Sequence, residues 1–266
     1  MSANPAPLQQ YDPNAFRFYR HALEVLAASD VPFLLGGAYA FGYYTGISRH
    51  TKDLDLFVRP AHVRPMLDVF ADAGYRTEMI FSHWLAKVNH GADFVDVIFS
   101  SGNGLCVVDD RWFEHAVAAE VLGVGVRLIP VEEMIWQKAF IMERERFDGA
   151  DGTHLLRARG RRLDWDRLLA RFGPRWRLLL AHLVLFGFVY PAHRDNIPVE
   201  VLRTLTDRLH DEPTGDSDGA LLCQGTLLSR MQYLADTEDW GYGDPRLLPL
   251  GRMTEEQVIR WTDAGR

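Results

Sequence analysis

Residues 49–60 read RHTKDLDLFVRP, and the centre of this stretch, residues 53–58, has the pattern of a β-strand that begins with acidic residues. Side chains in a strand alternate between its two faces, so Asp53 and Asp55 are expected on one face and the leucines between and after them on the other. Two carboxylates on one face repel each other unless a cation or an exposed position relieves the repulsion. The strand therefore indicates either a solvated acidic edge or a site for a divalent metal ion.

The composition of the 266-residue chain is that of a globular protein, because 47% of its residues are hydrophobic. The longest apolar run, residues 178–190, is interrupted by His182 and is too short to span a bilayer. No secretory signal pattern is present, so we expect a cytoplasmic protein without a membrane partner. The two cysteines, Cys106 and Cys223, have the spacing of neither a disulfide framework nor a zinc site.

The charge of the chain also limits its partners. A formal net charge of −7 argues against a broad nucleic-acid surface, so no stable DNA complex is expected. Arginine is nevertheless concentrated in residues 157–177. This basic stretch has two interpretations, a solvated helical face and a local surface for RNA.

The order of the predicted elements divides the chain into an α/β domain, residues 1–130, and an α-helical C-terminal region, residues 131–266. The predicted fold class is α+β, with a mixed β-sheet flanked by helices in the first part. The predicted strands are 32–35, 53–58, 84–88, 94–99 and 124–129, with a hairpin turn at 89–91. Helices are expected to begin near Pro13 and to cover 38–44, 61–73, 131–146, 165–172, 176–188 and most of 221–266. Residues 1–10 are expected to be disordered, and residues 211–219 to form a polar loop.

A glycine pair, Gly36 and Gly37, stands between the first predicted strand and the helix 38–44. Glycine lets backbone N–H groups approach a phosphate closely, and the N-terminus of the following helix adds a favourable dipole. Magnesium prefers carboxylate and phosphate oxygens together. The glycine pair and the two aspartates therefore predict a site for a nucleoside triphosphate with Mg²⁺.

A third carboxylate is expected beside the first two, because two-metal nucleotidyl transfer usually needs one more acid for the metal that activates the attacking hydroxyl. Asp96 is the best candidate, since it stands inside an apolar strand where an unpaired charge would cost several kcal/mol. Asp93 lies nearer the predicted turn and ranks second. Asp53, Asp55 and Asp96 are thus the predicted catalytic and metal-binding residues, with two Mg²⁺ ions expected and Mn²⁺ as the alternative ion.

These residues resemble the signature of the nucleotidyltransferases of the DNA polymerase beta-like superfamily, in which Gly-Gly is followed about a dozen residues later by Asp-x-Asp and a third Asp stands on a neighbouring strand. The pattern is most similar to the small bacterial branch that contains aminoglycoside nucleotidyltransferases and the toxin enzymes of abortive infection. The resemblance covers about residues 30–155. It implies a polymerase beta-like fold, nucleotide binding including ATP, and transfer of a nucleoside monophosphate to an acceptor hydroxyl with release of pyrophosphate.

Arg49, Thr51 and Lys138 are further candidates for nucleotide binding. Arg49 and Thr51 precede the aspartates as Arg-x-Thr/Ser does in the resembling family; they either contact phosphate or anchor the strand through hydrogen bonds. Lys138 lies on the apolar stripe of the predicted helix 131–146, where a lysine needs an anion. That anion is either a nucleotide phosphate or one of the nearby aspartates, Asp148 and Asp151.

Lys87, in the strand before Asp96, is expected at the surface because lysine is rarely fully buried. The acceptor stays open between two classes. A small hydroxylated molecule such as an aminoglycoside fits the acidic net charge, and an RNA 3′ end fits the basic stretch. The alternative to an enzyme is a non-catalytic module of the same fold that binds a nucleotide or a protein partner.

Overall fold

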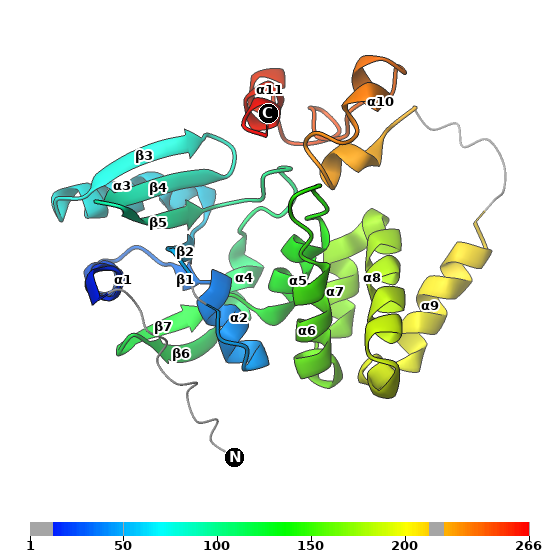
Figure 1. Cartoon of the computed structure of the whole chain (residues 1–266), viewed down its shortest axis with the longest axis horizontal. Helices are drawn as coiled ribbons and strands as arrows, with labels where there is room; N and C mark the ends of the chain where they lie inside the picture. The colour runs from blue at the N-terminus through cyan, green and yellow to red at the C-terminus, as the bar shows by residue number, and fades with distance from the viewer. Residues whose placement is uncertain (1–12, 50, 213–220, 266) are drawn as a thin grey trace. The chain divides into compact units, whose positions relative to one another are not determined.

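A computed structural model of the chain describes residues 13–49, 51–212 and 221–265 (Figure 1). The expected disorder of residues 1–10 and most of the expected loop at 211–219 lie outside the described residues. The chain divides into two units whose boundary falls between Pro130 and Val131. That these units are the predicted α/β domain and α-helical C-terminal region stays a prediction, and the two are described separately below.

The first unit is built on a seven-stranded sheet with the strand order β3-β4-β5-β2-β1-β7-β6 (Figure 1). Its strands are β1 (Leu34–Leu35), β2 (Asp53–Phe57), β3 (Arg76–Phe81), β4 (Leu85–His90), β5 (Asp93–Ile98), β6 (Val117–Val121) and β7 (Val124–Leu128). β2 pairs with β5, and β1 with β7, in parallel, whereas the other neighbours are antiparallel. The mixed sheet that the sequence predicts is confirmed.

The helices of the first unit are α1 (Pro13–Ala27), α2 (Gly37–Thr45), α3 (Val63–Asp72) and α4 (Asp110–Glu114). α1 packs against α3, β5 and β7, and α3 packs against β3 and β4, so these two helices cover the same face of the sheet. Leu54 and Val95 are fully buried. Because strand residues alternate, the aspartates of β2 and Asp96 of β5 point to the opposite face.

The sequence analysis did not predict two strands of this sheet, β3 and β6, and both lie at its edges. β3 is largely exposed and lacks the apolar alternation of a half-buried strand, because only one of its sides is paired. The hairpin between β4 and β5 turns at Gly91 and Ala92, whereas the prediction placed the turn at 89–91. Gly91 has a φ of +62°, a conformation that favours glycine in a two-residue turn.

The second unit is helical: α5 (Val131–Ala139), α6 (Gly149–Arg159), α7 (Trp165–Phe172), α8 (Trp176–Val189), α9 (Val199–His210), α10 (Leu234–Glu238) and α11 (Glu255–Asp263). α5 ends at residue 139 rather than at the predicted 146. Beyond it, Met142 forms a β-bridge with Phe147, and the Glu143 carboxylate accepts a hydrogen bond from the Ser229 hydroxyl. These tertiary contacts oppose continuation of the helix.

The prediction that residues 221–266 are mostly helical is wrong. Within residues 221–265, which the structure describes, only α10 and α11 are α-helices, besides one short 3-10 turn at Gln224–Leu227. Gly241 has a φ of +77°, and prolines stand at positions 245 and 249. Glycine in this conformation and proline both interrupt helices.

Among the described residues, one helical stretch, Trp165–Val189, has the length and mean hydropathy of a membrane span, a property that the core helices of many proteins share. It consists of α7 and α8, joined by a 3-10 turn at Gly173–Arg175.

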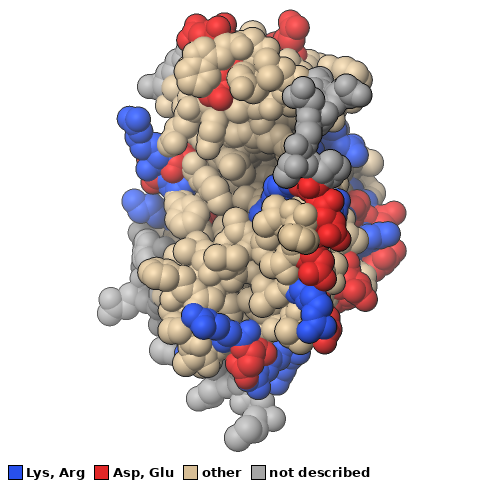
Figure 2. Space-filling model, turned by 90° about the vertical axis from the view of Figure 1, so that its right-hand side faces the viewer, with Lys and Arg blue, Asp and Glu red and all other residues tan. Residues whose placement is uncertain are grey.

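Figure 2 views the molecule from the side on which α9 lies in Figure 1, and uncharged side chains form most of the surface in view. Val184 and Phe188, one turn apart on α8, are 63% and 81% exposed.

Candidate active site

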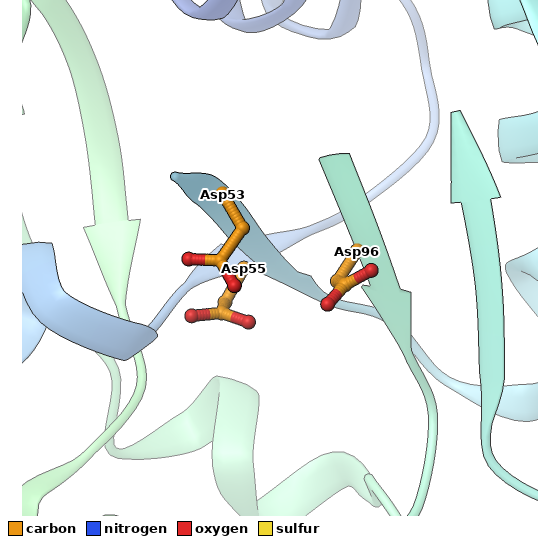
Figure 3. A group of neighbouring side chains, drawn as sticks. All are labelled: Asp53, Asp55 and Asp96. Atoms are coloured by element: carbon orange, nitrogen blue, oxygen red, sulfur yellow. The ribbon is translucent and has the colours of Figure 1, made fainter. Parts of the chain in front are cut away.

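Three carboxylates converge at the centre of the sheet. Asp53 and Asp55 project from β2 and Asp96 from β5 (Figure 3). The parallel register places Asp55 directly opposite Asp96, and one ligand oxygen from each of the three residues lies within 4.8 Å of the others. The structure therefore brings together the three acids that the sequence singled out. Asp93, the second-ranked candidate, lies on the opposite face of β5, together with Val95.

Asp96 is held by a cation that the sequence analysis assigned to the surface. Nζ of Lys87 lies 2.9 Å from Oδ1 of Asp96, and the Lys87 side chain is only 25% exposed. Burial raises the pKa of Asp96, the ion pair with Lys87 lowers it, and the charge of Asp53 raises it again, so that the net direction of the pKa shift is upward. Lys87 is thus partly exposed, but the β4–β5 register also sets it opposite Asp96, a contact that the sequence analysis did not predict.

The glycine pair lies directly against the acids. The backbone N–H of Gly36 donates to the carbonyl oxygen of Asp55 at 2.9 Å. Gly37 has a φ of +54°, and a Cβ atom at this position would lie 1.7 Å from Oδ2 of Asp55. α2 begins at Gly37, and its N-cap residue, Gly36, has no side chain that could cap the helix. Backbone N–H groups of a first helical turn thus stand next to a carboxylate, an arrangement suited to a metal-bound phosphate.

Thr51 and Arg49 have contacts within the first unit that fit their anchoring interpretation. The Thr51 hydroxyl donates a hydrogen bond to Oδ1 of Asp53. The Arg49 guanidinium carbon lies 4.4 Å from the centroid of the Phe41 ring. Thr51 consequently fixes the orientation of a predicted metal ligand. Direct contact of either residue with a nucleotide stays a prediction.

Lys138, in α5 of the second unit, forms the salt bridges that were the alternative to a phosphate contact. Its Nζ lies 2.8 Å from Oδ2 of Asp148 and 2.7 Å from Oδ2 of Asp151. Burial alone would raise the pKa of Asp148, but the hydrogen bonds and charges of Arg146 and Lys138 outweigh it and hold that pKa below its usual value. A nucleotide contact of Lys138 stays a prediction.

Several arginines of the stretch 157–177 are engaged within the second unit. Arg167 and Arg171, both 9% exposed, pair with the fully buried Glu133 of α5. The interpretation of this stretch as a solvated helical face is wrong for these two residues. As internal counter-ions of a buried carboxylate, they are also lost to any RNA surface.

The sequence of the chain matches a known protein family. A family model described as "Uncharacterised nucleotidyltransferase" matches residues 17–188, well over half of the chain. The chain belongs to this nucleotidyltransferase family. The resemblance to nucleotidyltransferases and the prediction of an enzyme of that kind are confirmed. No curated protein matches the chain.

Solved structures with similarity to this nucleotidyltransferase are distant from it. The antibiotic-resistance factor ANT(2″)-Ia is 17% identical, with 65% of this chain and 98% of that chain covered and a TM-score of 0.45. The lincosamide antibiotic adenylyltransferase LnuA, with lincomycin bound, is 15% identical, with coverages of 54% and 96% and a TM-score of 0.38. A nucleotidyltransferase-like protein from Paracoccidioides brasiliensis is 13% identical, with coverages of 63% and 91% and a TM-score of 0.37. The substrates named for these structures belong to those proteins and not to this chain.

Proposed function

We propose that this nucleotidyltransferase moves a nucleoside monophosphate from a nucleoside triphosphate, such as ATP, to a hydroxyl group of a small acceptor. The observation that carries the proposal is the convergence of Asp53, Asp55 and Asp96 within 4.8 Å, with the Gly36–Gly37 turn against Asp55. The turn that would bind phosphate thus lies directly against one of the acids that would bind the metal. This is the arrangement that nucleotidyl transfer requires.

The donor set fits magnesium. All three side chains offer carboxylate oxygens, the ligand type that Mg²⁺ and Mn²⁺ prefer, and all three are half-buried, so their mutual repulsion is only partly screened by water. Asp53, Asp55 and Asp96 would hold the metal, and we propose two ions as the complement. When bound, such ions neutralise charge on the triphosphate and acidify the attacking hydroxyl.

The chain's own groups divide the remaining work. The N–H groups at Gly37 and the start of α2 would bind phosphate oxygens, with Arg49, Thr51 and Lys138 as further candidates for contact. Asp96 would orient the acceptor hydroxyl. The acceptor oxygen forms a bond to the α-phosphorus as the bond from that phosphorus to the bridging oxygen breaks, and pyrophosphate leaves. The hydroxyl proton would pass to the carboxylate of Asp96, which acts as the general base of this proposal.

The small acceptor is favoured over an RNA end by the internal ion pairs of Arg167 and Arg171. Because these two arginines are engaged inside the protein, the basic stretch 157–177 offers fewer cations to an RNA acceptor. A small hydroxylated acceptor needs no such stretch.

The test is pyrophosphate release from each of the four nucleoside triphosphates with Mg²⁺ or Mn²⁺, in the presence of a panel of hydroxylated small molecules and, separately, of total RNA. We expect release with one acceptor class and its loss by at least about 100-fold in Asp53→Ala and Asp55→Ala. Asp68→Ala, which removes an exposed carboxylate of α3, is the matched control and should leave release unchanged. Full turnover in either active-site variant contradicts the mechanism.

A further inference from the structure

The face of the sheet that carries the acids also carries a row of charged residues that stand in register across four strands. Glu78 of β3 pairs in register with Lys87 of β4, Lys87 with Asp96 of β5, and Asp96 with Asp55 of β2. These four side chains follow one line across four neighbouring strands. Lys87 is thus placed beside Asp96 by the backbone register and not by the reach of a flexible side chain alone.

Lys87 has two contacts at this position. Its Nζ lies 2.9 Å from Oδ1 of Asp96 and 3.4 Å from the centroid of the Phe94 ring. Phe94 and Asp96 stand two residues apart on the same face of β5. With 25% of its side chain exposed, Lys87 has room to move toward solvent, while Phe94 offers a cation–π contact that does not depend on Asp96.

The ammonium group occupies the position of a counter-ion for one of three crowded carboxylates. In the metal-free protein it offsets part of the repulsion among Asp53, Asp55 and Asp96. A divalent cation that binds Asp96 meets this positive charge at close range. Two cations then compete for one carboxylate, and the repulsion between them is strong because Asp96 is only 16% exposed.

We propose that Lys87 is a built-in counter-ion of the metal site, which balances Asp96 in the metal-free enzyme and gives way when a divalent cation binds that carboxylate. The inference rests on the proposed function, because it takes the three acids as the metal ligands. It adds an order to the reaction: metal at Asp96 is disfavoured until the negative charge of the nucleotide arrives. In this proposal, Lys87 is a positioning residue that determines at which stage of the reaction the metal binds Asp96.

The experiment is Mn²⁺ binding without nucleotide at pH 8, followed by the electron paramagnetic resonance signal of free Mn²⁺. The variants are Lys87→Met, which removes the charge, and Lys87→Arg, which keeps it. Lys52→Met is the matched control, because it removes the same charge from an exposed residue next to Asp53 for which the described part of the chain shows no ion pair. We expect Lys87→Met to bind Mn²⁺ about fivefold tighter or more than wild type, and the other two variants to stay within about twofold.

Tighter binding separates this role from a structural one, because a damaged site binds metal more weakly. Lys87→Met binding equal to or weaker than wild type overturns the inference and leaves the proposed function intact. Lys87→Arg binding as tight as Lys87→Met overturns it as well, because charge is then not the cause. If neither wild type nor Lys87→Met binds Mn²⁺, even with a non-hydrolysable triphosphate analogue, the metal site itself is wrong and the role of Lys87 falls with it.

Discussion

The carboxylate of Asp55 lies so close to the α-carbon of Gly37 that any side chain at residue 37 would collide with it, since a Cβ atom there would stand 1.7 Å from Oδ2. The turn that would bind phosphate and the acid that would bind metal are therefore in direct contact.

Gly37→Ala should abolish pyrophosphate release and weaken Mn²⁺ binding, because the methyl group must push Asp55 out of the acid cluster. Gly46→Ala is the control: Gly46 also has a positive φ, +74°, but a Cβ atom there meets nothing within 4 Å. Both variants carry backbone strain of about 1 kcal/mol. Activity in Gly37→Ala equal to that of Gly46→Ala contradicts the contact.

Thr51→Val should lower kcat by about 10- to 100-fold with little change in melting temperature, because Asp53 loses the hydroxyl that orients its carboxylate. Thr51→Ser keeps that hydroxyl and should recover most of the activity. Steady-state kinetics at saturating Mg²⁺ measure the difference. Equal rates in the valine and serine variants would show that the hydrogen bond has no role.

Lys138→Met should destabilise the protein by about 3–5 kcal/mol, because Asp148 and Asp151 are left buried without this cation. The free energy of unfolding in urea measures the loss, and Arg203→Met, in an exposed pair with Glu200, is the control with an expected change of under about 1 kcal/mol. Adding Asp148→Asn and Asp151→Asn to Lys138→Met should restore part of the stability. An unchanged stability in Lys138→Met would return this lysine to a purely nucleotide-binding role.

Acid should weaken the second unit through His182. Burial lowers the pKa of this imidazole, although its hydrogen-bonding contact with the carbonyl of Ala139 opposes the shift. A folded pKa below the unfolded value means that the unfolded chain takes up the proton first, so stability is full above about pH 6.5 and falls as the pH drops below it. The free energy of unfolding between pH 7.5 and pH 5 should decline less in His182→Gln than in wild type. His210→Gln, which changes an exposed histidine, should follow wild type; parallel curves for all three proteins would exclude His182 as the cause.

Local patterns were sufficient to predict the acids and the elements that carry them. The alternation in β2, the isolated charge of Asp96 in an apolar strand and the glycine pair are all readable within a few residues. The helix predicted at 165–172 has the bounds of α7. In each of these places the residues that decide the structure are neighbours in sequence.

The role of Lys87 depended on a turn and was missed for that reason. A turn at 89–91 would set Lys87 opposite Asp93, whereas the observed turn at Gly91 and Ala92 sets it opposite Asp96. A shift of this size changes every partner along both strands. The end of α5 was missed for a different reason, because the contact of Glu143 with Ser229 joins residues far apart in the chain.

The parallel pairing of β2 with β5 also means that the acids meet only when the chain folds. α3 and the β3–β4 hairpin lie between these strands in sequence, so the pairing closes a long loop and is a non-local contact. In the unfolded chain Asp55 and Asp96 are apart and scarcely repel. Their repulsion belongs to the native state alone, and a metal ion that relieves it acts selectively on the folded protein.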